Sequence, residues 1–140
     1  ENQQLVGGSL EPMNEAAVLT WLNYKRSDEG THIFAIICQD EFVGYVLITA
    51  IDKVNGHAVF GINITRSSQG QGVGAIAMDF VHIFCKKELS LRKLILYVRA
   101  DNQRAISLYK RLGYKSVGSL QNHIKVNGSY VANDIMEVFL

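Results

Sequence analysis

Three glycines at alternate positions, directly ahead of an expected helix, are the first feature of this chain that points to chemistry. The segment Gln69–Ala75 reads Q-G-Q-G-V-G-A, and glycine lets the main chain approach a ligand closely. Successive N–H groups in such a loop form a concave anion site, to which the following helix adds its unpaired N–H groups and the positive end of its dipole. We therefore expect a phosphate or pyrophosphate to bind here.

Positive charge gathers directly downstream of this loop. Residues 86–115 carry nine basic and two acidic side chains, whereas residues 1–65 carry three basic and eight acidic ones. The cluster favours a small polyanionic ligand, and solvated helix faces are the alternative explanation. No aromatic residues alternate with the bases and no recognition helix accompanies them, so we do not expect a nucleic-acid partner. No His, Cys, Asp and Glu residues have the spacing of a metal site, so we expect no metal.

Two familiar phosphate-binding arrangements fit this loop poorly. A mononucleotide P-loop requires Gly-Lys-Ser/Thr at the start of the helix, where this chain has Gly74-Ala75-Ile76. A dinucleotide fold suits the glycines, but Asp101 lies further from Gly70 than the usual spacing of about 20 residues. Three expected antiparallel strands also precede the loop and leave too little chain for the remaining parallel strands of that fold.

The elements that must position the loop follow from hydrophobic periodicity and turn signals, and they predict one α/β domain over residues 1–140. Helices are expected after Asn14, over residues 73–85 and over residues 103–112. A mixed, largely antiparallel sheet of about seven strands is expected between them. Its strands are Gln4–Glu11, Ile33–Gln39, Phe42–Ile51, His57–Thr65, Leu94–Val98, Tyr114–Leu120 and Val131–Leu140. The last of these strands could also pair across a homodimer.

Composition favours a folded protein of the cytoplasm. The chain is 48% hydrophobic with a net charge of +1, which is typical of a globular domain rather than a disordered one. The longest apolar run, Phe42–Ile51, is too short to span a bilayer, so we expect no membrane association. The N-terminus lacks a basic region followed by an apolar stretch, so no secretory signal is expected. Cys38 and Cys85 lie in apolar runs and are expected to be reduced.

Two motifs, in order, resemble those of the GCN5-related N-acetyltransferase family. The family pattern Q/R-x-x-G-x-G/A matches residues 69–74, and N-x-x-A-x-x-x-Y-x-x-x-G-F matches residues 102–114 with Tyr114 in place of the final Phe. Weaker matches over residues 117–120 and 126–130 are similar to the branch of ribosomal-protein and polyamine acetyltransferases. The resemblance covers residues 9–140. It implies the family's fold, acetyl-CoA as the co-substrate and transfer of the acetyl group to a primary amine.

The same resemblance implies where acetyl-CoA binds. The loop formed by Gln69, Gly70, Gln71, Gly72, Val73, Gly74 and Ala75 is expected to hold the pyrophosphate through its N–H groups. The main chain of Asn63, Ile64 and Thr65 is expected to pair with pantetheine as an added strand would. Asn102 corresponds to a residue that hydrogen-bonds the cofactor arm, and it is equally suited to cap a helix. Both roles stay open.

Tyr109 corresponds to the family's general acid, which protonates the departing thiolate. A phenol with a pKa of about 10 can donate to a thiolate whose conjugate acid has a pKa of about 8.5. The alternative is an aromatic core residue. The general base is less evident, because many family members carry a carboxylate on the fourth strand and residues 58–63 have none. We take His57 as the candidate base, with Asp52, His32 or a chain of water molecules as alternatives. The notable alternative for His57 is a loop residue without a role, which its position at the head of the strand favours.

The acceptor is expected to be a cationic amine, such as a polyamine, an aminoglycoside-like sugar or a protein N-terminus. The segment that usually shapes the acceptor pocket in this family is acidic here, with Glu11, Glu15, Asp28 and Glu29. The missing carboxylate leaves a second class of function open. In that alternative the chain is a non-catalytic acyl-CoA-binding sensor or interaction module of the same fold.

Overall fold

The computed structural model describes residues 30–140. The expected first strand, the helix after Asn14 and the acidic residues Glu11, Glu15, Asp28 and Glu29 lie outside the described residues. Six strands and two α-helices follow in the order β1 (His32–Cys38), β2 (Glu41–Asp52), β3 (His57–Ile64), α3 (Val73–Lys87), β4 (Lys93–Arg99), α4 (Gln103–Arg111), β5 (Lys115–Val126) and β6 (Ser129–Phe139). One 3-10 turn, η1 (Arg66–Ser68), joins β3 to α3. The six strands correspond to the last six of the sequence prediction.

The strands form one sheet in the order β1-β2-β3-β4-β6-β5. Every neighbouring pair is antiparallel except β3 and β4, so the expected mixed and largely antiparallel sheet is confirmed. β5 extends beyond the predicted end at Leu120, because its pairing with β6 resumes at Ile124 after an irregularity in register. β6 lies between β4 and β5. The expectation that this strand pairs across a homodimer is therefore wrong, since both of its edges are occupied within the chain.

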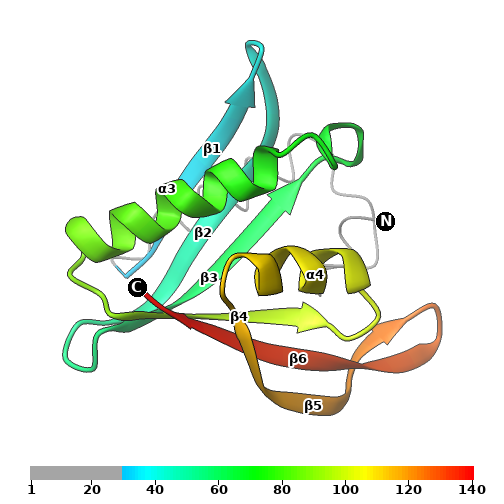
Figure 1. Cartoon of the computed structure of the whole chain (residues 1–140). Coiled ribbons are helices and arrows are strands. Elements are labelled where there is room, and N and C mark those ends of the chain that lie inside the picture. The colour runs from blue at the N-terminus through cyan, green and yellow to red at the C-terminus, as the bar shows by residue number, and fades with distance from the viewer. Residues whose placement is uncertain (1–29) are drawn as a thin grey trace.

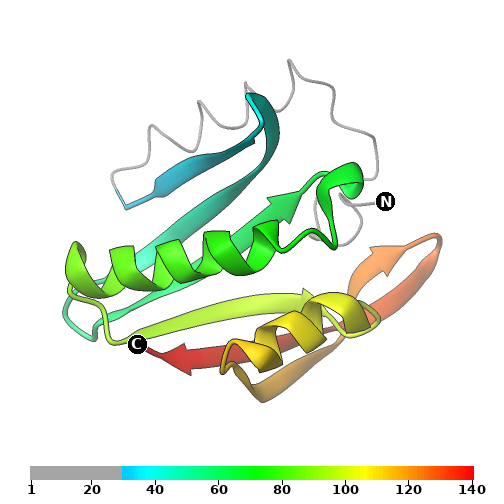
Figure 2. The same cartoon turned by 45° about the horizontal axis from the view of Figure 1, so that its top comes forward.

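Both helices lie on the same face of the sheet, with α3 over β1–β3 and α4 over β4 (Figures 1 and 2). Helix α3 directs Met78, Val81 and Cys85 toward the sheet, a spacing that places them on one helical face. The core between the helices and the sheet is apolar and includes the fully buried Ile48, Leu94, Leu96 and Met136. Within the described residues, no helix is long and apolar enough to cross a membrane.

The parallel strands β3 and β4 separate along their length. Their pairing covers three residue pairs, from His57–Lys93 to Val59–Ile95. Beyond Val59 the two strands diverge toward their carboxyl ends (Figure 1). The beginning of α3 and the beginning of α4 lie beside this opening, because each helix follows directly from one of the two strands. The divergence is what creates room for a ligand.

Candidate functional site

A cavity of about 520 Å³ opens where β3 and β4 separate. Among residues 30–140, four parts of the chain contribute to its wall: the second half of β3, the end of β4, the glycine loop with the first turn of α3, and α4. The lining residues are Phe60, Gly61, Ile62, Asn63, Ile64, Ser68, Gln69, Gly70, Gly72, Gly74, Ala75, Leu96, Tyr97, Val98, Asn102, Arg104, Ala105, Leu108, Tyr109, Arg111 and Leu112. The volume is in the usual range of small-molecule sites.

The glycine loop has the conformation that its sequence predicts. Gly70 and Gly72 have φ angles of +78° and +81°, which favour glycine because a Cβ is strained there. Gly72 is the N-cap of α3, and no side chain of the described residues caps the helix there. The N–H groups of the first turn therefore remain available to a ligand. A Cβ at Gly74 would lie 3.2 Å from Ile64 Cδ1 and 3.3 Å from Leu108 Cδ2, so a small residue lets β3, α3 and α4 pack closely.

The end of β3 presents main-chain groups to the cavity in alternation. The Thr65 N–H donates to the Val43 carbonyl oxygen at 2.8 Å, which directs Thr65 toward β2. Because main-chain groups alternate in direction along a strand, Asn63 also faces β2 whereas Ile62 and Ile64 face the cavity. The Gln69 side chain donates to the Ile64 carbonyl oxygen at 3.0 Å, which agrees with that direction. Of the three residues expected to pair with pantetheine, Ile64 is the one whose main chain faces the cavity.

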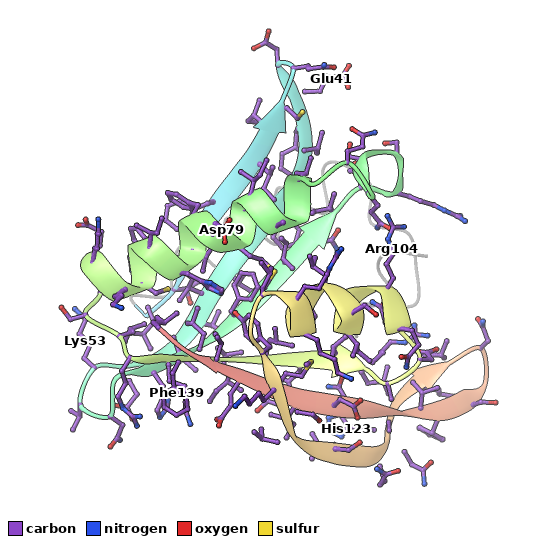
Figure 3. All side chains as sticks on the ribbon, in the orientation of Figure 1. Glu41, Lys53, Asp79, Arg104, His123 and Phe139 are labelled. Carbon is purple, nitrogen blue, oxygen red and sulfur yellow. The ribbon has the colours of Figure 1, made fainter. Side chains whose placement is uncertain are left out.

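Positive charge at the cavity mouth comes from α4. Arg104 donates to the Gln69 Oε1 atom at 3.3 Å, and a Cβ at Gly70 would lie 2.8 Å from Arg104 Nη2. Figure 3 shows Arg104 in the space between α4 and the loop that precedes α3. Arg111 lines the same cavity. Neither arginine was singled out from the sequence as a site residue. The signal was the cluster of bases over residues 86–115, which does not say which of them face the ligand.

Tyr109 and Asn102 both reach the cavity from α4. Asn102 is the N-cap of this helix, and its Oδ1 accepts from the Ala105 N–H at 3.2 Å, so the capping role is confirmed. Tyr109 is 8% exposed. Burial raises the pKa of Tyr109 to about 12, since the phenolate is poorly solvated there. Tyr109 therefore keeps its proton throughout the neutral range, as a general acid must.

The proposed bases lie elsewhere. His57 is at the start of β3, about 10 Å along the strand from Phe60, the first β3 residue that lines the cavity. Its Nε2 atom is 3.7 Å from Asp52 Oδ2, and Asp52 accepts from the main chain and side chain of Asn55. His32 contacts the ring of Phe84 on α3. None of these three side chains is among the cavity-lining residues of the described chain.

The structure thus brings together nine of the residues predicted from the sequence: Asn63, Ile64, Gln69, Gly70, Gly72, Gly74, Ala75, Asn102 and Tyr109. Thr65, Gln71 and Val73 flank the cavity in sequence without lining it, and His57 is remote from it. The residues that local motifs identified near the glycine loop and on α4 include most of those that line this cavity. His57 was inferred only from its position at the head of a strand, and strand direction places that end away from the opening.

A family model and several known proteins match this chain. The model of the Acetyltransferase (GNAT) family matches residues 4–114. The chain is 32% identical over 103 residues to spermidine N(1)-acetyltransferase of Escherichia coli strain K12, covering 74% of this chain and 55% of that protein. It is 25% identical over 129 residues to ribosomal-protein-serine acetyltransferase of the same strain, covering 80% of this chain and 72% of that protein.

A solved structure has the same fold. Spermidine N-acetyltransferase from Vibrio cholerae, crystallised with CoA and spermine, superposes with a TM-score of 0.87 at 22% sequence identity, covering 99% of this chain and 82% of that one. The chain spans about half the length of the curated spermidine acetyltransferases that it matches.

Proposed function

Because the chain belongs to the acetyltransferase (GNAT) family, we propose that it transfers the acetyl group of acetyl-CoA to a primary amine by direct attack in a ternary complex. The observation that carries this proposal is the convergence of three features on one cavity: a helix N-terminus that no described side chain caps, an edge of β3 that no described strand pairs beyond Val59, and the buried phenol of Tyr109. We also propose that residues 1–140 form a single domain, since the described sheet continues beyond the matched residues to Phe139.

We propose one direction for acetyl-CoA in the cavity. The pyrophosphate would accept hydrogen bonds from N–H groups of residues 71–75, where the dipole of α3 favours negative charge. Arg104 would add a cation at the same end, because its guanidinium already lies against Gly70. The pantetheine arm would follow β3 and pair with the main chain of Ile62 and Ile64. The thioester would then lie deeper between β3 and β4, near Tyr109.

The chemistry is a transfer from sulfur to nitrogen. The neutral amine attacks the thioester carbonyl carbon to form a C–N bond, and the C–S bond breaks with its electron pair on sulfur. The Tyr109 hydroxyl donates a hydrogen bond to that sulfur, and any proton that passes to the thiolate is returned to Tyr109 by solvent. The amine nitrogen gives up its proton to solvent, and Tyr109 is the acid rather than the base because burial holds its pKa at about 12. Water is the base this cavity favours, since the described lining contains no carboxylate or histidine.

The acceptor we propose is a cationic amine, and a polyamine is the first candidate. Two observations support it. Three of the matched relatives are named for spermidine, and the N-terminal part of the sequence is acidic. Cys38 and Cys85 are free thiols, which supports the predicted cytoplasmic location.

One observation favours the second candidate, an acyl-CoA sensor or interaction module that does not catalyse transfer. The described lining contains no carboxylate or histidine. This observation assigns the base to water, but it would also suit a protein that binds acetyl-CoA without deprotonating an amine. Tyr109 argues against this alternative, because a sensor has no need for a proton donor at the thioester.

The test is amine-dependent release of thiol from acetyl-CoA at about pH 8, where a small fraction of a primary amine is neutral. The panel contains spermidine, an aminoglycoside, free amino acids and a peptide with a free N-terminus, at matched ionic strength. Release with spermidine or the aminoglycoside supports both the activity and the cationic acceptor. Faster release with neutral or acidic amines contradicts the acceptor class. No release from protein that binds acetyl-CoA by calorimetry contradicts catalysis and favours the sensor.

A further inference from the structure

Tyr114 is a buried phenol at a position where the family pattern has phenylalanine. It is 2% exposed, and its hydroxyl lies 2.9 Å from the Nε2 atom of His82. Burial raises the pKa of Tyr114 and lowers the pKa of His82. Both side chains are therefore neutral at about pH 8, and the phenol donates to Nε2 when the imidazole carries its proton on Nδ1. The Tyr114 hydroxyl, which a phenylalanine at this position would lack, therefore has a hydrogen-bond partner in His82.

The hydrogen bonds that end α4 place Tyr114 beside Tyr109. Gly113 has a φ of +92°, and the Tyr114 N–H donates to the Tyr109 carbonyl oxygen at 3.0 Å while the Gly113 N–H donates to the Lys110 carbonyl oxygen at 3.1 Å. These two bonds form a Schellman motif, which brings the side chains at its two ends into contact. The ring centroids of Tyr109 and Tyr114 are 5.8 Å apart with the rings inclined by 56°. The Tyr114 ring therefore forms one side of the site occupied by Tyr109.

His82 connects this pair to the other helix. It lies on α3, whose first turn is the proposed phosphate site, whereas Tyr109 lies on α4. The imidazole and Tyr114 rings are 5.6 Å apart, so the contact includes packing as well as the hydrogen bond. Among the described residues the hydroxyls of Tyr109 and Tyr114 share no hydrogen bond, which argues for packing rather than proton transfer between them.

We infer that His82 is a positioning residue for Tyr109: by holding the Tyr114 hydroxyl from α3, it fixes the ring against which the Tyr109 phenol is placed at the thioester. This inference rests on the proposed acetyl transfer. The physical requirement is that acetyl-CoA is anchored at the start of α3 while its sulfur must meet a group on α4. A contact that links the two helices therefore fixes the distance between the phosphate site at the start of α3 and Tyr109 on α4. Displacements of about 1 Å at a reacting group reduce rates by up to roughly a hundredfold.

The experiment measures single-turnover acetyl transfer and thermal unfolding for His82→Ala, His82→Gln, Tyr114→Phe and the double variant H82A/Y114F. Tyr114→Phe keeps the ring and the fold. We expect the single-turnover rate constant to fall about tenfold in His82→Ala and Tyr114→Phe, with KM for acetyl-CoA within about twofold of wild type. The double variant is expected to fall no further, since both changes remove one interaction. His82→Gln should recover most of the rate, because its amide can still pair with the phenol.

Two matched controls change residues that are not among those lining the cavity. His123→Ala removes an exposed histidine from β5, at the far side of the sheet order (Figure 3). Tyr130→Phe removes a hydroxyl from a ring that is 58% exposed. Both are expected to keep the wild-type rate.

Two results would overturn the inference while wild type remains active. One is an unchanged rate constant in both single variants. The other is that the single variants lose rate only in proportion to their unfolded fraction, while H82A/Y114F regains both the stability and the rate of wild type. A wild type without amine-dependent thiol release refutes the proposed function instead, so the two failures are distinguishable.

Discussion

Replacing Tyr109 by Phe removes one hydroxyl from the cavity wall and keeps the ring that packs against Tyr114. The expected effect follows from the environment of the phenol. Burial raises the pKa of Tyr109 from 10.0 to about 12, whereas an ordinary thiol has a pKa of about 8.5. The difference between the pKa of Tyr109 and that of the thiol therefore widens from about 1.5 to about 3.5 pKa units. Complete proton transfer from Tyr109 to the thiolate then costs about 5 kcal/mol, at about 1.36 kcal/mol per pKa unit.

Tyr109 is then most effective as a hydrogen-bond donor to sulfur while the C–S bond breaks. A hydrogen bond to a charged group contributes about 1.5–3 kcal/mol, which corresponds to roughly 10- to 150-fold in rate. We expect Tyr109→Phe to lose this factor in the single-turnover rate constant and to keep its affinity for acetyl-CoA. Loss of the thioester ultraviolet absorbance is the suitable signal, because a thiol reagent would also react with the partly exposed Cys38.

The pH profile provides a second test of the same reasoning. An acid with a pKa of about 12 stays protonated below that pH, so the wild-type rate should show no decline from loss of the Tyr109 proton between about pH 8 and pH 10. Tyr130→Phe, at an exposed ring, is the control and should keep the wild-type rate. An unchanged rate constant in Tyr109→Phe would refute the role. A declining limb near pH 10 that disappears in the variant would refute the effect of burial.

Three further outcomes are expected. Gly72→Ala should lose roughly 1 kcal/mol of stability from its positive φ and should also bind acetyl-CoA more weakly. Gly128→Ala is the control, because Gly128 has a φ of +82° and, as at Gly72, no atom lies within 4 Å of an added Cβ. The control should show only the loss of stability, measured by urea unfolding. Arg104→Gln should raise KM for acetyl-CoA about tenfold, or about 1.4 kcal/mol, and leave KM for S-acetylpantetheine, which has no phosphate, unchanged. Lys110→Gln, at an exposed residue of the same helix, is the control. Equal effects of Arg104→Gln on both substrates would contradict a phosphate contact.

Stability should also fall in alkali, because burial raises the folded-state pKa of Cys85 from 9.0 to about 11 and that of Tyr109 from 10.0 to about 12. The unfolded chain releases these protons first, so stability is complete below about pH 9 and declines by about 2–3 kcal/mol per group toward pH 12. Urea midpoints across this range measure the decline, Cys85→Ala should remove its earliest part, and a flat profile would contradict the burial argument.

The local features of the site were predictable from the sequence, because each depends on a few neighbouring residues. Glycine permits the left-handed φ at Gly70 and Gly72 that turns the loop into the first turn of α3. An asparagine before an amphipathic run caps α4, and Gly113 ends it. The six described strands were likewise identified from apolar runs bounded by turn signals, which also depend only on neighbouring residues.

The tertiary structure decided what depends on which strands are neighbours. Periodicity identifies a strand but not its partner, so the inner position of β6 and the separation of β3 from β4 came only from the assembled sheet. The same long-range pairing places His57 at the closed end of that opening. Arg104 and Gln69 are 35 residues apart in sequence, and His82 and Tyr114 are 32 apart. No local rule relates such pairs, because their contact exists only once the sheet has brought the two helices onto one face.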